Sequence, residues 1–243
     1  MKRLAFLSFS AIAYAVFLST FLYLIAFVAG LPILPKSVDH GGGAPVIIAV
    51  LVDLLLITAF ALQHSIMARP GFKRLWTMLV PEPIERSIYV LAASLALILL
   101  FMLWQPVPDV LWRVGGGGAV LLWAVFGLGW LIVLLSTFLI SHFELFGLKQ
   151  SWDHVHGRAR RLAVFRTPFF YRLVRHPLYS GFFIAFWATP YMTLGHLMFA
   201  TGMSTFMLVA IRFEERDLVG TFGEDYVRYR ARTGMLAPRL RRG

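Results

Sequence analysis

Cysteine is absent from this 243-residue chain, and charged residues make up only 14% of it. Without cysteine the chain forms no disulfide, binds no metal through thiolates and uses no covalent cysteine nucleophile. Soluble domains carry roughly one quarter charged residues, whereas 59% of this chain is hydrophobic. We therefore expect an integral membrane protein with short connections between its spans and room for one domain.

Internal repeats are also absent, which argues against a transporter built from duplicated halves. No A-x-A cleavage site follows the first apolar run, so we expect residues 4–30 to be a membrane helix rather than a cleaved signal. Acidic residues are scarce, with 12 Asp and Glu against 23 Lys and Arg. Membrane proteins sort Lys and Arg to the cytoplasmic side, and for this reason we expect no nucleic-acid partner.

Five apolar stretches have the length to enter a membrane. They are residues 4–29, 45–67, 87–104, 119–141 and 178–211. The last stretch is too long for one span of about 20 residues and short for two. Pro190 and the break at residues 193–196 divide it. The sequence therefore predicts an all-α integral membrane protein with about six transmembrane helices, the last two forming a tight hairpin.

The distribution of positive charge predicts the orientation of the spans. With the N-terminus inside, every Lys and Arg except Lys36 and Arg113 falls on the inner side. We therefore expect both termini in the cytoplasm and the protein in the bacterial inner membrane. The single domain would comprise four N-terminal spans (1–141), a cytoplasmic loop (142–177), and a cofactor-binding hairpin with a C-terminal segment (178–243).

Two kinds of connection join these spans. The glycine-containing outer loops, residues 31–44 and 105–118, are expected to be short and flexible, without chemistry of their own. The inner loop before residue 175 mixes aromatic and basic residues, as an amphipathic helix at the lipid headgroups would. Membrane anchoring and a lid over a site fit this loop equally well.

A cationic motif interrupted by proline begins the last apolar stretch. Pro177 suits the first turn of a helix, where its missing N–H costs nothing, and this leaves His176 at the helix mouth with free backbone donors. Tyr179 follows on a similar face, and Gly181 leaves space for a ligand or for a partner helix. The motif alone fits an interfacial anchor as well as a site for an anion.

Charged residues recur at the end of the same stretch. Arg212 and Glu215 are three residues apart, which places them on one helix face. Glu214 and Glu215 bring two carboxylates to a membrane boundary, where like charges are unfavourable without a partner. One interpretation is a structural ion pair between Arg175 and either glutamate, and the other is a site for a polar cofactor.

The joint pattern carries a family resemblance. The order R-H-P-x-Y-x-G (175–181), R-x-E-E-x-x-L-x-x-x-F-G-x-x-Y-x-x-Y (212–229) and Pro238 resembles membrane methyltransferases such as isoprenylcysteine carboxyl methyltransferase and bacterial phospholipid methyltransferases. Residues 141–150 and 167–171 are more narrowly similar to the bacterial methanethiol S-methyltransferases, relatives of the NnrU-type membrane proteins. Residues 169–171, Phe-Phe-Tyr, replace the G-x-Y of the isoprenylcysteine pattern, which speaks against a prenyl-protein substrate.

The resemblance implies that S-adenosylmethionine binds at the cytoplasmic end of the last hairpin. Cations and helix-mouth donors would hold its carboxylate, an acidic side chain its ribose hydroxyls, and tyrosine rings its adenine. The predicted cofactor-binding residues are Arg175, His176, Pro177, Tyr179, Gly181, Arg212, Glu214, Glu215, Tyr226 and Tyr229.

A thiol acceptor is mostly protonated at neutral pH, so a general base or a stabilised thiolate is expected. The candidate catalytic residues are His142 at the end of the fourth span and His64 near the cytoplasmic end of the second. His142 is preferred because it belongs to the segment that resembles the thiol methyltransferases. His64 also fits an interfacial histidine bonded to backbone. Asp53 is either functional or buried against a partner. No metal site is expected, because His154 and His156 lack further ligands.

We therefore predict a methyltransferase that uses S-adenosylmethionine to methylate a small thiol, foremost methanethiol to dimethyl sulfide, within the lipid bilayer. Alternative acceptors are a phospholipid amine and an isoprenylcysteine carboxylate. A non-enzymatic NnrU-like transporter or assembly protein is the alternative of a different class. It would need polar residues along several spans, yet apart from Asp53 and Gln63 the spans are nearly uncharged. The oligomeric state is left open.

Overall fold

The computed structural model describes residues 1–159 and 164–239. The predicted loop 142–177 is therefore described without residues 160–163, and the C-terminal segment without residues 240–243. The described elements are α1 (Lys2–Val28), α2 (Val46–Ala68), α3 (Pro70–Trp76), α4 (Glu82–Leu103), β1 (Val110–Arg113), α5 (Gly116–Ile140), α6 (His142–Leu145), α7 (Leu148–Val155), the 3-10 helix η1 (Phe169–Arg172), α8 (Pro177–Trp187), β2 (Tyr191–Thr193), α9 (Leu194–Phe222) and α10 (Glu224–Arg232).

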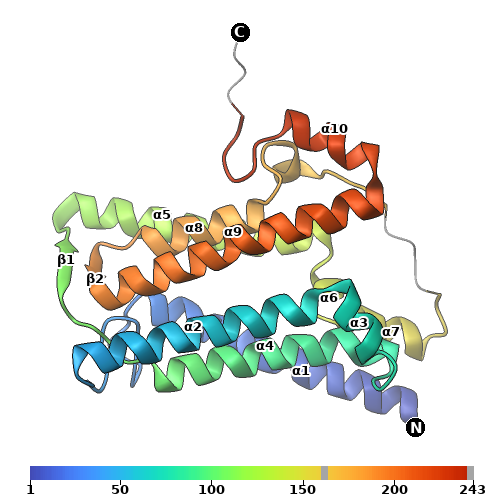
Figure 1. Ribbon diagram of the computed structural model, residues 1–243, viewed down its shortest axis with the longest axis horizontal. Coiled ribbons are helices and arrows are strands. Elements are labelled where there is room, and N and C mark those ends of the chain that lie inside the picture. The colour runs from blue at the N-terminus through green and yellow to red at the C-terminus, as the bar shows by residue number, and fades with distance from the viewer. Residues whose placement is uncertain (160–163, 240–243) are drawn as a thin grey trace. The chain divides into compact units, whose positions relative to one another are not determined.

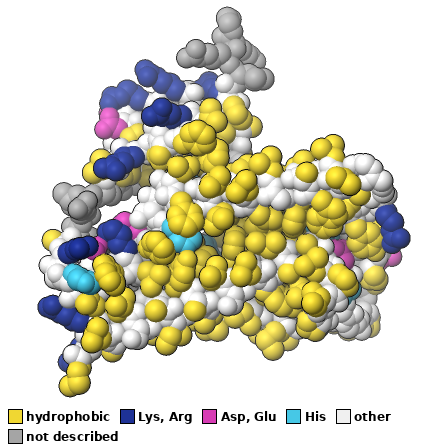
Figure 2. All heavy atoms as spheres, turned by 180° about the vertical axis from the view of Figure 1, so that it is seen from behind, with side chains coloured by type: hydrophobic (Ala, Val, Ile, Leu, Met, Phe, Trp, Pro, Cys, Tyr) yellow, Lys and Arg dark blue, Asp and Glu magenta, His cyan; other side chains and the backbone are white. Residues whose placement is uncertain are grey.

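Five of these helices, α1, α2, α4, α5 and α9, are long and apolar enough to cross a membrane. Their outer surfaces are apolar as well, since Ile47 of α2 is 75% exposed and Val120 of α5 is 70% exposed. Figure 2 shows hydrophobic side chains spread over the helical surfaces. Such surfaces are stable against lipid rather than water, which confirms a mostly helical integral membrane protein. The count of six spans stays a prediction, because α8 has only 11 residues and a span needs about 20.

The first four predicted spans coincide with helices, and the largest difference among these four concerns the start of α4. We expected this helix to begin at Ser87, whereas it begins at Glu82. Pro83 lies in its first turn, and Glu82 and Glu85 place negative charge beside the helix N-terminus. Both features favour helix initiation. The apolar stretch in the sequence begins only after these charged residues, and the prediction from hydropathy therefore missed the first turn of this helix.

The last apolar stretch is divided between two helices, as Pro190 predicted. The helix α8 ends at Trp187, and α9 begins at Leu194. The helix α9 then continues without a break to Phe222, over about 43 Å at 1.5 Å per residue. Its final part therefore carries Glu214 and Glu215 on a continuous helix. That α8 and α9 form a tight membrane hairpin stays a prediction.

The chain folds into two compact units. Unit 1 comprises Met1–Trp112, His142–Arg161 and Met192–Gly202, and unit 2 comprises Arg113–Ser141, Leu162–Tyr191 and Met203–Gly243. In unit 1, α1 and α2 both pack against α4, and α7 packs against α1 and α4 (Figure 1). In unit 2, α5 packs closely against α8 (Figure 1).

The loop at residues 31–44 is held by hydrogen bonds, in contrast to the flexible connection that its glycines predicted. Asp39 accepts a hydrogen bond from Thr193 Oγ1 at 2.7 Å and lies 3.3 Å from Nδ1 of the fully buried His196. Lys36 Nζ donates to the carbonyl of Met102 at 3.0 Å. Buried polar groups need such partners, so the loop is part of the packed end of unit 1. The loop at residues 105–118 contains β1, which pairs with β2 in a two-stranded sheet.

Candidate functional site

The candidate site lies in unit 2, at the beginning of α8. This helix starts at Pro177 with His176 as its N-cap, as the sequence predicted. The backbone N–H of Arg175 donates to the carbonyl of Gly234 at 2.8 Å, and that of His176 donates to Met235 at 3.1 Å. The segment after α10 thus runs along the residues that precede α8. These backbone bonds fix Arg175 and His176 at the start of α8.

Glu215 of α9 is the centre of a cluster of charges. Its Oε1 accepts hydrogen bonds from Arg175 Nε at 2.6 Å and from His176 Nε2 at 3.1 Å, because a carboxylate can only accept. Its Oε2 lies 4.0 Å from Arg230 Nη1. The side chains of Arg175 and Glu215 are each only 12% exposed. Charge-assisted hydrogen bonds in such surroundings are strong, and they select Glu215 over Glu214 as the partner of Arg175.

The neighbouring carboxylate binds the tyrosine of the same motif. The Tyr179 hydroxyl donates to Glu214 Oε2 at 3.1 Å. Tyr179 lies on α8 and Glu214 on α9, so each of the two adjacent glutamates is bonded to one part of the segment that opens α8. The two halves of the sequence pattern therefore meet in one place.

An aromatic group adjoins these charges. The ring of Phe165 lies 5.4 Å from that of Tyr229 and 6.0 Å from that of Tyr226. The Tyr229 hydroxyl donates to the backbone carbonyl of Tyr171. Tyr226 is only 2% exposed, and its hydroxyl has no hydrogen-bond partner among the described residues.

Burial raises the pKa of the Tyr226 hydroxyl and raises that of Tyr229 to about 12. Both hydroxyls therefore stay protonated at neutral pH and can donate. A buried donor without an acceptor costs about 1–3 kcal/mol. The Tyr226 hydroxyl is thus the one group of this aromatic cluster that a bound ligand could satisfy.

Two predicted residues contribute differently from the rest. A Cβ on Gly181 would come within 2.6 Å of the Gly129 carbonyl oxygen and 2.8 Å of the Val133 nitrogen. Of the two roles that the sequence left open for Gly181, the structure supports the close approach of a partner helix, α5. Arg212 is exposed and forms no ion pair within the described ranges.

The candidate catalytic histidines lie in unit 1, and each is bonded to a tyrosine. His142 Nε2 is 2.8 Å from the hydroxyl of Tyr14, and His64 Nε2 is 2.7 Å from that of Tyr89. Burial lowers the pKa of His142, so its imidazole is neutral at neutral pH. Sequence reasoning missed both tyrosines, because a single tyrosine in an apolar helix carries no pattern that distinguishes it from a packing residue.

Known proteins similar to this chain identify its family. No family model and no solved structure matches the chain. The methanethiol S-methyltransferase of Mycobacterium tuberculosis (strain ATCC 25618 / H37Rv) is 51% identical over 239 residues, which cover 98% of both chains. That of Pseudomonas sp. (strain GM41(2012)) is 52% identical over 238 residues, which cover 98% of this chain and 91% of the relative.

A more distant relative is the nurim homolog of Drosophila pseudoobscura pseudoobscura, 30% identical over 176 residues and 70% of each chain. The identity to the S-methyltransferases is far higher and extends over nearly the whole chain. It confirms the resemblance inferred from the sequence and the prediction of an enzyme. The chain therefore belongs to the methanethiol S-methyltransferase family.

Proposed function

We propose that this chain transfers the methyl group of S-adenosylmethionine to the sulfur of methanethiol and so produces dimethyl sulfide. The main support is the identity of about one half to methanethiol S-methyltransferases over 98% of the chain. The geometry adds a second support, because Arg175 and His176 from one half of the pattern bind Glu215 from the other. A phospholipid amine and an isoprenylcysteine carboxylate are the rival acceptors.

The donors and acceptors of unit 2 fit the chemistry of the proposed cofactor, which supplies an electrophilic methyl group when bound. Arg175 and His176 offer N–H groups to its carboxylate. Glu214 and Glu215 offer acceptors to its ribose hydroxyls and ammonium group. The Tyr226 hydroxyl, buried without a partner among the described residues, would gain an acceptor.

The other residues of the proposed site act by shape and charge. Tyr229 contributes an aromatic face beside Phe165, and Tyr179 holds Glu214 in place. Pro177 sets where α8 begins, and Gly181 sets how closely it packs on α5. We propose Arg212 as an outer cation, because it is exposed on the same face of α9 as Glu215.

The protein's task in such a transfer is to hold the acceptor sulfur in line with the methyl carbon and to exclude water. We propose His142 as the base that takes the thiol proton, since its neutral imidazole can accept one. Tyr14 would orient this ring through its bond to Nε2. His64, held by Tyr89 in the same way, is the second candidate base.

For the arrangement in the membrane we propose a single domain with six spans, the last two a tight hairpin. Both termini would face the cytoplasm of a bacterial inner membrane. The support is that Lys36 and Arg113 are the sole cations outside the inner segments of this topology. Reporter fusions at the two termini test it: a signal from the periplasmic side at either terminus would contradict the six-span arrangement.

The decisive experiment is transfer of a tritiated methyl group by the purified, detergent-solubilised protein. Methanethiol, a phospholipid amine and a prenylcysteine would be offered separately with S-adenosylmethionine, and calorimetry would measure binding of the cofactor alone. We expect binding and transfer to methanethiol. Transfer to the phospholipid amine or to the prenylcysteine carboxylate alone would show that this compound, and not methanethiol, is the acceptor. Absence of cofactor binding would overturn the proposal.

A further inference from the structure

Arg86 of α4 is anchored in unit 1 to α6 and beside the ring of Tyr89. Its Nε donates to the carbonyl of Leu145 at 2.8 Å, in the short helix that begins with His142. Its guanidinium carbon lies 4.9 Å from the ring centre of Tyr89, whose hydroxyl is bonded to His64. The guanidinium is thus held between α6 and the Tyr89–His64 pair.

The charge of Arg86 is not compensated within the part of the chain that the structure describes. Nε is its only nitrogen with a hydrogen-bond acceptor there, and no carboxylate forms an ion pair with it. Glu82 and Glu85 lie on the same helix. Its side chain is part-buried. An anchored guanidinium with free N–H groups at a part-buried position is suited to bind an anion.

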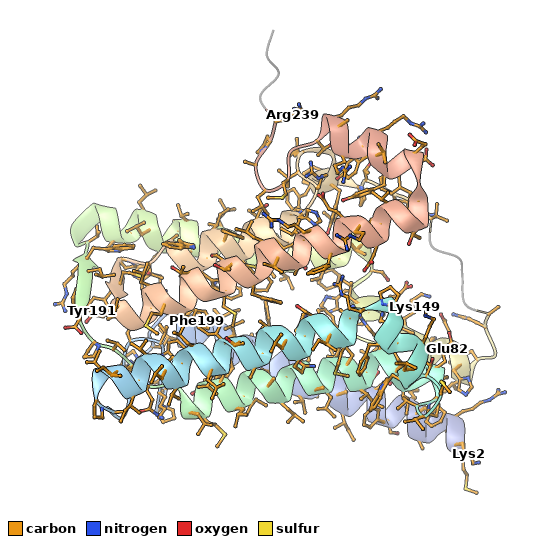
Figure 3. All side chains as sticks on the ribbon, in the orientation of Figure 1. Lys2, Glu82, Lys149, Tyr191, Phe199 and Arg239 are labelled. Carbon is orange, nitrogen blue, oxygen red and sulfur yellow. The ribbon has the colours of Figure 1, made fainter. Side chains whose placement is uncertain are left out.

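The surrounding charges do not supply that anion. Lys2, Glu82 and Lys149 lie at the same end of unit 1 (Figure 3). Lys149 bonds to Asp153 at 2.8 Å and lies 3.9 Å from Glu144, so these acidic groups are already paired. The groups that can titrate or carry charge on the elements around Arg86 are Lys2, Arg3, Tyr14 and Tyr23 on α1, Asp53 and His64 on α2, Glu82, Glu85 and Tyr89 on α4, His142 and Glu144 on α6, and Lys149, Asp153 and His154 on α7.

We infer that the free N–H groups of Arg86 bind the acceptor sulfur in its thiolate form. This inference rests on the proposed function. The thiol S–H bond breaks and its proton passes to the base, for which we proposed His142. A sulfur lone pair then forms the new S–C bond while the S–C bond of the donor breaks, leaving a neutral sulfide. A nearby guanidinium favours the thiolate, which is the nucleophilic form.

The test compares two thiols of similar size and different acidity, ethanethiol and 2,2,2-trifluoroethanethiol. At saturating cofactor, Arg86→Gln should raise the KM for ethanethiol about tenfold or more, the loss expected for one hydrogen bond to a charged group. The more acidic thiol needs less help to ionise, so its KM should rise much less. The pH midpoint of kcat/KM for ethanethiol should move upward, and cofactor affinity should not change.

Two further variants keep the test decisive. Arg74→Gln removes an exposed cation from α3 and should change neither KM. Arg86→Lys keeps the charge and should recover part of the ethanethiol activity, which provides the comparison if Arg86→Gln fails to fold. Equal KM increases for both thiols, or no increase, would overturn the role of Arg86. A wild-type protein that binds cofactor and methylates neither thiol would instead overturn the proposed acceptor.

Discussion

Arg175 Nε lies 2.6 Å from Glu215 Oε1, although the two residues are 40 positions apart. A second arginine–carboxylate contact in unit 2, Arg228 Nη2 to Asp225 Oδ1, has the same length, but its side chains are 60% and 64% exposed. Water screens the exposed pair, whereas the first pair has little access to water. We therefore expect contacts of equal length to differ in their effect on stability and binding.

Glu215→Gln should lower the free energy of unfolding by about 2 kcal/mol, less than the loss of a fully buried ion-pair partner, because both side chains keep 12% of their surface exposed. It leaves Arg175 and His176 without their shared anion and should also weaken binding of S-adenosylmethionine. Denaturation in detergent and calorimetry measure the two effects. The matched control, Asp225→Asn, should change stability by less than about 1 kcal/mol. Equal effects of both substitutions would contradict the role given to Glu215.

The sequence predicted much of this cluster because each of its two halves is a local pattern along the chain. Pro177 marked the start of α8, and helical spacing placed Glu215 on a face with other charged residues. The sequence did not predict which glutamate pairs with Arg175, because the pairing depends on how α9 is rotated against α8. Nor did it predict the part of residues 234–235, whose backbone carbonyls bind the residues before α8, since any residue type can supply a carbonyl.

Tyr226→Phe should leave the stability of the ligand-free protein unchanged or slightly higher, because it removes a buried hydroxyl that has no partner among the described residues. Tyr229→Phe removes a hydroxyl that donates to a backbone carbonyl, and it should cost about 1 kcal/mol. For the binding of S-adenosylmethionine, the two substitutions should rank in the opposite order. Tyr226→Phe should have the larger effect and weaken binding about tenfold. Calorimetry that finds unchanged cofactor affinity for Tyr226→Phe would remove this residue from the site.

Gly181→Ala should destabilise unit 2 by about 1–3 kcal/mol, because the added Cβ would overlap backbone atoms of α5. Gly129→Ala, which adds a Cβ to the same contact from the other helix, should have a similar effect. The loss of stability in the double variant should differ from the sum of the two single losses. Gly127→Ala serves as control, since its Cβ would meet nothing within 4 Å. Cofactor affinity of the folded Gly181→Ala protein should be nearly unchanged; a large loss would restore Gly181 as a ligand contact.

The histidines of unit 1 show where sequence reasoning ended. Hydropathy placed His64 and His142 near the inner ends of their spans, but the tyrosines that hold them come from other helices. Sequence reasoning also missed the position of Arg86. Hydropathy placed this residue outside the predicted span, whereas the structure includes it in α4. Partners between helices depend on packing, which a single sequence does not encode as a local pattern.

The stability of the protein should respond to acid through His142. Burial lowers the pKa of this imidazole in the folded state, whereas in the unfolded chain it is about 6.5. Below that pH the unfolded state binds more protons than the folded state, so the free energy of unfolding decreases as the pH falls. The favourable contribution of the neutral ring is complete above about pH 6.5 and is lost as the pH falls through the folded-state value.

His142→Gln removes this titration, and Tyr14→Phe provides the matched control because it removes the same hydrogen bond and keeps the imidazole. At pH 8 each variant should be less stable than the wild type by about 1 kcal/mol. Towards pH 5 the difference should shrink for His142→Gln, since the wild type alone loses stability through this group. For Tyr14→Phe the difference in stability from the wild type should stay nearly constant, because burial rather than the tyrosine is the main cause of the lowered pKa.

Denaturation curves recorded between pH 5 and pH 8 test the role of His142 in the acid response. Parallel pH profiles for the wild type and His142→Gln would show that the ring does not titrate as its burial requires.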